Sequence, residues 1–132
     1  MSHKSDKARL EYLLKMISDI ERICERHHGI THALEDNEGF HAITMCCFQI
    51  GEVMNKIEAP EIREKLPISL SYSMRNIIAH DYIGVDPRRI ADTVEKDIPD
   101  LKCIVETILE QGDRIGRNKP IQCKGAKKTR IT

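Results

Sequence analysis

The sequence is poor in aromatic residues and in long apolar runs. It has no Trp, two Phe and three Tyr among 132 residues, which excludes a multi-ring base-stacking platform of the RRM or OB-fold type. The apolar run at 42–50 is too short to span a bilayer and is interrupted by Thr44 and Gln49. The N-terminal residues lack the apolar stretch of a signal peptide. We therefore expect a cytoplasmic protein without a membrane segment.

Metal and cofactor motifs are also missing. The five cysteines are odd in number and include no CxxC pair, a pattern that predicts reduced thiols rather than a disulfide framework or a zinc ribbon. Nothing resembles a P-loop, a Rossmann fingerprint or a serine triad, so we expect no cofactor. Cys24, His28 and His32 fit either a zinc site or a helix-end histidine cluster, and the lack of a second ligand pair favours the cluster. We expect no metal.

Charge divides the chain into two parts. The formal net charge is zero, but residues 1–110 hold 14 basic and 20 acidic side chains, whereas 111–132 hold 7 basic and 1 acidic. We therefore expect one domain over 1–111, a common domain size, and a flexible basic tail over 112–132 rich in Gly and Lys. The tail has three open interpretations: a solvated end, an arm that contacts RNA, or a docking segment for a partner.

Apolar residues recur at spacings of three and four, which predicts amphipathic helices. The expected start and stop signals are, in order, Ser5 and Gly29, Asn37 and Pro60, Pro67 and Gly84, Asp86 with Pro87, and Pro99 and Gly112. No segment alternates apolar and polar residues in the manner of a strand. The fold class predicted is all-α, an up-and-down bundle of four or five helices.

A dense polar cluster, MRNIIAHDY at 74–82, interrupts the third apolar stripe. At about 100° per residue, Asn76 and His80 share one helix face, so the amide could orient the imidazole. Arg75 lies about 140° from His80 around the helix. A twofold dimer packed through this helix would bring Arg75 of one chain toward His80 of the other.

Two interpretations of this cluster are open from the residues alone. A histidine can move a proton near neutral pH, and an arginine can bind a phosphate through its planar fork. Together they suit metal-independent RNA cleavage by attack of the 2′-hydroxyl, with His80 as general acid or base and Arg75 stabilising the transition state. The alternative interpretation is structural: Arg75 and His80 would cap the helix end and form salt bridges there. Glu52 similarly is either an ion-pair partner that positions Arg75 or an ordinary exposed carboxylate.

The string RNIIAHDY resembles the RNxxxHxY motif of the HEPN domain, specifically the HepT-like toxins of HEPN/MNT toxin–antitoxin modules. Ile50-Gly51-Glu52 is similar to that family's IGE segment on the second helix. Two downstream segments, IGVD at 83–86 and VEKDIPDL at 94–101, resemble its YxGVD and VxxDLPxL segments. The resemblance covers about Ser5 to Leu109 and leaves out the tail.

This resemblance implies a helical homodimer that acts as a metal-independent ribonuclease toxin. By matching position, Arg75 and His80 would be catalytic, with Asn76 supporting them. Asp81 and Glu52 are further candidates for supporting residues. The cognate antitoxin would be a minimal nucleotidyltransferase that transfers AMP from ATP to Tyr82. Added bulk and negative charge there would repel an RNA phosphate.

An alternative function stays open. The chain could be a non-catalytic subunit that binds the nucleotidyltransferase, either presenting it with substrate or serving as the antitoxin. The same arginine and histidine would then hold a dimer interface together.

Overall fold

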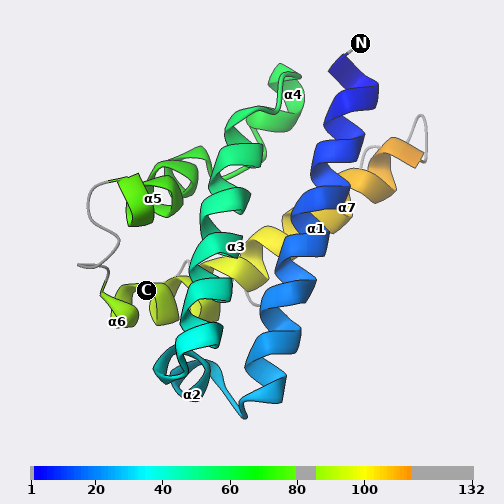
Figure 1. Cartoon of the computed structure of the whole chain (residues 1–132). Helices are drawn as coiled ribbons and strands as arrows, with labels where there is room; N and C mark the ends of the chain where they lie inside the picture. Colours follow the sequence, from blue (N-terminus) through cyan, green and yellow to red (C-terminus); the bar gives the residue numbers. More distant parts are fainter. Residues whose placement is uncertain (1, 80–85, 114–132) are drawn as a thin grey trace.

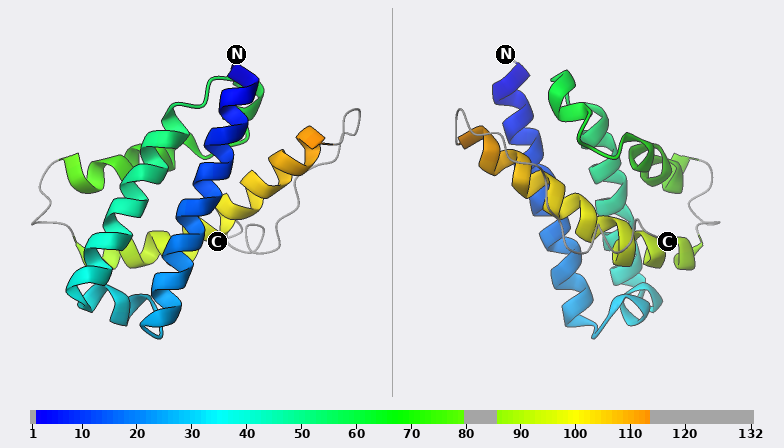
Figure 2. Two further views of the ribbon diagram at one scale, coloured as in Figure 1. Left: turned by 45° about the vertical axis from the view of Figure 1, so that its right-hand side comes forward. Right: turned by 180° about the vertical axis from the view of Figure 1, so that it is seen from behind.

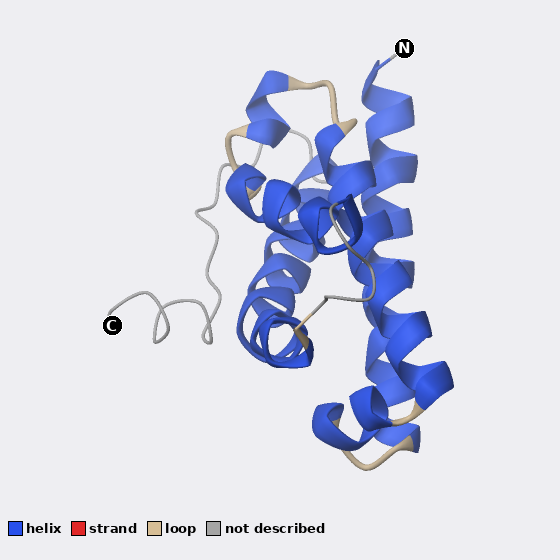
Figure 3. Cartoon of the chain, turned by 60° about the vertical axis from the view of Figure 1, so that its left-hand side comes forward, coloured by secondary structure: helices blue, strands red, loops and turns tan. Residues whose placement is uncertain are grey.

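The computed structural model describes residues 2–79 and 86–113. Within these residues the chain is helical, with short connections and no strand (Figures 1 and 3). The elements are α1 Ser2–Arg26, α2 Ile30–Glu35, α3 Asn37–Asn55, α4 Pro60–Arg63, α5 Ile68–Ala79, α6 Pro87–Asp92, the π-helix η1 Thr93–Asp97, and α7 Ile98–Asp113. The all-α prediction is confirmed, while the homodimer and the domain division at 111/112 stay predictions.

The two longest helices, α1 and α3, lie side by side and run in opposite directions, with α2 at the turn between them (Figures 1 and 2). Their facing stripes are almost completely buried: Leu10, Leu13, Ile17 and Ile20 from α1, and Ile43, Cys47, Ile50 and Met54 from α3. These are the apolar positions spaced by three and four, so the helical period predicted the core correctly.

Two further helices complete the core. Helix α5 packs against α3 and α7 crosses α1, and the view from behind in Figure 2 shows both on the same side of the α1–α3 pair. Leu101, Val105 and Ile108 of α7 and Met74 of α5 are buried. Because α5 packs on α3, Arg75 at the start of the polar cluster is placed beside α3.

The first two helix starts differ from the expected ones. Ser5 lies inside α1, which begins at Ser2 and therefore does not use Ser5 as its cap. The cap of α3 is Asp36 rather than Asn37: Asp36 has an extended backbone, and its Oδ2 accepts a hydrogen bond of 2.8 Å from the Gly39 N–H. Both residue types cap helices well, so the sequence alone did not distinguish the two neighbours.

The turn after α1 is made by two residues with positive φ, 63° at His28 and 132° at Gly29. Helix α1 has already ended at Arg26, one turn earlier than the glycine signal suggested. Gly29 supplies a backbone conformation that other residues rarely adopt, which reverses the chain into α2.

The prolines act differently from expectation at two places. Helix α3 ends at Asn55, and Pro60 opens the short helix α4 as its first residue. Pro99 does not restart the chain, because α6, η1 and α7 follow one another without a break. Proline cannot donate the usual helical hydrogen bond, and the wider turn of η1 just before Pro99 accommodates that loss.

The remaining boundary signals have mixed outcomes. Pro67 immediately precedes α5, and Asp86 caps α6 by accepting from the Arg88 N–H at 3.0 Å, both as expected. Gly84 lies outside the described residues. Gly112 does not end its helix, because α7 continues to Asp113. None of the described helices is long and apolar enough to cross a membrane.

The cysteines only partly follow the prediction of reduced thiols. Cys24, Cys46 and Cys47 are free, but Cys103 is disulfide-bonded, so the prediction is wrong at that position. An odd count and the lack of CxxC do not report on pairing between distant cysteines. Burial raises the pKa of Cys47 to about 12, so this thiol behaves as a small core side chain.

A buried carboxylate ties the start of α1 to the connection between α3 and α4. Asp6 is fully buried and accepts hydrogen bonds from the backbone N–H of Glu58 at 3.0 Å and of Ala59 at 2.8 Å. The Arg9 guanidinium lies 3.1 Å away. Burial alone raises the pKa of Asp6, but the two backbone hydrogen bonds and Arg9 outweigh it and hold the pKa below its usual value.

We predict that Asp6→Asn lowers the free energy of unfolding by about 2–3 kcal/mol at pH 7, because the amide has one acceptor oxygen in place of two and loses the charge that pairs with Arg9. A carboxylate with a lowered folded-state pKa stabilises fully above its unfolded pKa of about 3.9 and loses that contribution as the pH falls through the folded value. The gap between wild type and Asp6→Asn should therefore narrow below about pH 4.

Urea unfolding from pH 7 down to pH 3 measures this gap. Glu11→Gln, at an exposed carboxylate on the same helix, is the matched control and should stay within about 0.5 kcal/mol of wild type. A gap for Asp6→Asn that does not change with pH would contradict the assignment.

Candidate active site

A close approach of α3 and α5 sets the geometry of the site. The Ser71 hydroxyl donates a buried hydrogen bond of 2.8 Å to the Gly51 carbonyl. A Cβ at Gly51 would lie 2.9 Å from the Ser71 carbonyl oxygen and 3.1 Å from the Arg75 backbone nitrogen. Only glycine lets the two backbones meet at this distance. Gly51 therefore marks a close contact between the two helices.

This contact brings Arg75 of α5 beside Glu52 of α3. The Arg75 Nε lies 3.1 Å from Glu52 Oε2, and each side chain is about one-third exposed. Of the two interpretations of Glu52, the ion pair is therefore confirmed. The contact is made through Nε and the side chain is about one-third exposed, so the N–H donors on the two terminal nitrogens could bind a phosphate.

An aromatic ring accompanies the arginine. The guanidinium carbon of Arg75 lies over the ring of Tyr72, 5.8 Å from its centroid. Sequence reasoning missed Tyr72, although an aromatic residue three positions before an arginine on a helix is a spacing at which side chains meet. The Arg75 side chain is thus held between a carboxylate and a ring.

The other predicted site residues have separate outcomes. Asn76 lies on α5 next to Arg75 and is exposed. His80, Asp81 and Tyr82 lie outside the described residues, directly after α5. The pairing of Asn76 with His80 and the meeting of Arg75 and His80 across a dimer therefore stay predictions.

The histidine-rich turn after α1 gives no support to the zinc alternative. In ranges 2–79 and 86–113 there is no group of three His, Cys, Asp or Glu side chains that could hold a metal ion. At this turn His27 Nε2 lies 3.8 Å from Asp36 Oδ2. Burial, and then the charges of Glu95 and Glu21, raise the pKa of Cys24, which disfavours the thiolate that zinc requires.

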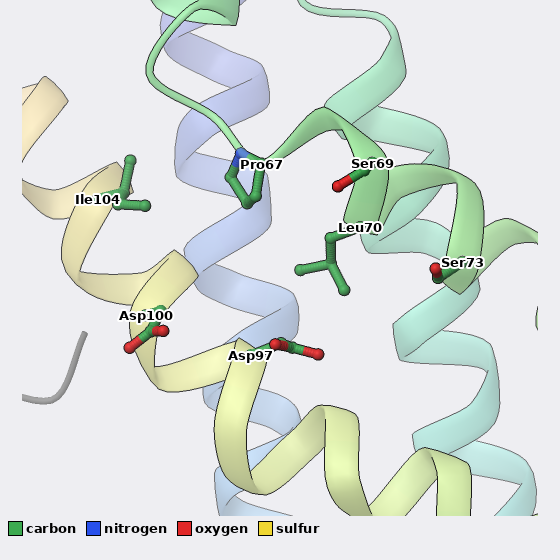
Figure 4. Close-up of a pocket in the computed structure, with 7 residues that line it drawn as sticks. All are labelled: Pro67, Ser69, Leu70, Ser73, Asp97, Asp100 and Ile104. Carbon is green, nitrogen blue, oxygen red and sulfur yellow. The ribbon is translucent and has the colours of Figure 1, made fainter. Parts of the chain in front are cut away.

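A cavity of about 250 Å³ lies between α5 and the η1–α7 segment (Figure 4). Its lining comprises Pro67, Ser69, Leu70, Ser73, Asp97, Asp100 and Ile104. Ser69, Leu70 and Ser73 lie on the opposite side of α5 from Arg75, given about 100° per residue. Its two carboxyl side chains would repel an RNA phosphate, so the cavity is not the candidate site.

The comparison with known proteins finds a match over the region that contains these residues. A family described as ribonuclease HepT-like matches residues 13–108, which include the α3–α5 contact and the Arg75–Glu52 pair. The chain belongs to the HepT-like ribonuclease family. No solved structure matches the chain.

Relatives carry names that agree with this family. The chain is 31% identical over 104 residues to the putative RNase TTE0752 of Caldanaerobacter subterraneus subsp. tengcongensis, covering 76% of this chain and 93% of the relative. It is 34% identical over 73 residues to the putative RNases MJ1216 and MJ0125 of Methanocaldococcus jannaschii. That match covers 53% of this chain and 60% and 62% of the two relatives.

We predict that Gly51→Ala lowers the free energy of unfolding by about 1–3 kcal/mol, because the new methyl group would collide with the α5 backbone. Gly112→Ala is the matched control: it lies in α7 with nothing within 4 Å of a new Cβ, and should be neutral or stabilising by up to about 1 kcal/mol. Thermal and urea unfolding of the two variants test this. Equal stabilities would contradict the close approach.

Proposed function

We propose that this HepT-like protein is the ribonuclease toxin of a toxin–antitoxin module in the cytoplasm. It cleaves RNA without a metal ion: the 2′-hydroxyl attacks the adjacent phosphorus, His80 acts as general acid or base, and Arg75 stabilises charge on the transition state. The observation that carries the proposal is the Arg75 guanidinium, oriented by Glu52 and partly exposed within the family's matched region.

Arg75 suits a phosphate ligand for an electrostatic reason. The body of the chain, residues 1–110, has six more acidic than basic side chains, so RNA is not attracted by its overall field. Binding must depend on a local cationic group with free donors. Arg75 would provide this group, since Glu52 engages its Nε and the side chain is about one-third exposed.

The proposed active site needs two copies of the chain. Arg75 and His80 lie about 140° apart around a straight helix, so one helix does not direct both side chains at the same phosphate. In a twofold homodimer, Arg75 of one protomer would face His80 of the other. Asn76 and Asp81 would support the histidine from the same motif.

The proposed partner is a minimal nucleotidyltransferase antitoxin. It would transfer AMP from ATP to the Tyr82 hydroxyl, with release of pyrophosphate. An adenylate two residues past His80 would place a negative phosphate and a bulky nucleoside at the catalytic motif. Both would oppose the entry of RNA.

We predict that wild type cleaves single-stranded RNA in the presence of EDTA, and that Arg75→Ala and His80→Ala each reduce cleavage about 100-fold or more. Gel analysis should show 2′,3′-cyclic phosphate ends, the product of 2′-hydroxyl attack. Arg63→Ala is a control for the loss of an arginine elsewhere, because Arg63 contacts the backbone carbonyls of residues 55 and 57. Per amount of folded protein, this variant should cleave RNA as fast as wild type. Loss of cleavage in EDTA, or equal cleavage by all variants, would contradict the mechanism.

Expression of the chain alone distinguishes the toxin from the alternative subunit. Growth arrest that requires His80 agrees with a toxin. Normal growth at confirmed expression of folded protein would instead favour a non-catalytic subunit that binds the nucleotidyltransferase.

We predict that the chain gains one adenylate when it is incubated with ATP and the nucleotidyltransferase encoded by the adjacent gene. The modified protein should no longer cleave RNA. Intact-mass spectrometry measures the addition. Tyr82→Phe should gain nothing, whereas Tyr12→Phe, which alters an exposed tyrosine on α1, should be modified normally. Addition to Tyr82→Phe would place the modification elsewhere.

A further inference from the structure

Tyr72 is an exposed aromatic side chain beside the proposed phosphate-binding arginine. It is 60% exposed, compared with 37% for Tyr12. Its neighbour Ser71 and the nearby Met74, on the core face of α5, are fully buried. The Tyr72 ring therefore contributes little to the core, and packing does not explain an aromatic residue here.

Two contacts fix the position of Arg75 relative to this ring. Glu52 holds the guanidinium at Nε, and the guanidinium carbon lies 5.8 Å from the Tyr72 centroid. An arginine beside an open aromatic face is a combination that binds nucleotides, because the cation pairs with the phosphate and the ring stacks on the base. A high exposed fraction shows that much of the ring is open to a ligand.

We propose that Tyr72 is a binding site for one nucleobase of the RNA, that of a nucleotide next to the phosphate held by Arg75. The choice of RNA as ligand rests on the proposed function. One ring serves one base, which differs from the multi-ring platforms that the aromatic content excludes. Stacking on an aromatic ring tolerates any base because every base has a π-face, so Tyr72 holds a base at one position of the RNA without selecting its identity.

Fluorescence tests this directly, because the chain contains no tryptophan. Tyr72→Trp keeps an aromatic ring and introduces the sole tryptophan of the protein. Titration with a short single-stranded RNA carrying 2′-O-methyl groups, which blocks attack by the 2′-hydroxyl, should quench its emission. Tyr12→Trp places the same reporter on α1 and should not be quenched.

A second measurement separates base stacking from a merely structural role. Tyr72→Ala should weaken binding of the same RNA about tenfold, and Tyr72→Phe should bind like wild type. A series of RNAs then carries one abasic residue, placed at a different position in each RNA. Wild type should bind one of these RNAs about tenfold more weakly than the intact RNA, whereas Tyr72→Ala should bind that RNA and the intact RNA equally. A structural role would weaken binding of intact and abasic RNA equally.

The outcomes separate this site from the proposed chemistry. Quenching without cleavage by the wild-type protein would support the base site and reject the ribonuclease proposal. A different set of results would overturn the base site alone: wild type cleaves RNA, the emission of Tyr72→Trp is not quenched, and Tyr72→Ala loses as much affinity for the abasic RNAs as wild type does. The base site would also be overturned if Tyr72→Ala shifts the monomer–dimer equilibrium while wild type binds intact and abasic RNA equally. The ring would then be assigned to a contact between subunits.

Discussion

The contact between α3 and α5 at Gly51 is the constraint on which the candidate site depends. A hydrogen bond from Ser71 to the Gly51 carbonyl and the lack of a Cβ at Gly51 place the two backbones against each other. Glu52 is the next residue on α3, and Arg75 is one turn after Ser71 on α5. The same register that closes the core therefore also determines which carboxylate meets which arginine.

Burial changes across this contact from the core to the surface. Ser71 and Met74 are completely buried, while Glu52 and Arg75 are each about one-third exposed. A fully buried ion pair would incur a large desolvation cost and would be closed to a ligand. A fully exposed pair would hold the arginine only weakly. The intermediate position keeps Arg75 oriented and accessible.

The helices could be predicted from the sequence because their cores depend on period. Apolar residues at spacings of three and four in α1 and α3 form the buried seam between these two helices. The exact helix ends were less predictable. Asp36, not Asn37, is the N-cap of α3, because two adjacent residues with the same capping chemistry can each fill this position. Pro99 was accepted inside a continuous helix because η1 absorbs its missing donor.

The site was only partly predictable for a different reason. The Arg75–Glu52 pair joins residues 23 apart in sequence, and its formation depends on how α5 is placed along α3. Spacing within one helix carries no information on that placement, so both roles of Glu52 were open until the fold was known. Tyr72 lies three positions before Arg75 on the same helix, so their contact, unlike the ion pair, was predictable from helical spacing.

The geometry of the Arg75–Glu52 pair also bears on how a ligand would enter. A carboxylate that occupied the outer edge of the guanidinium would have to be displaced by an incoming phosphate, since both anions would compete for the same donors. Glu52 instead contacts Nε. On the proposed function, a phosphate would bind the N–H donors of the terminal nitrogens while Glu52 remains in place. Glu52 would then be a positioning residue for Arg75, with its ion pair compatible with a bound substrate.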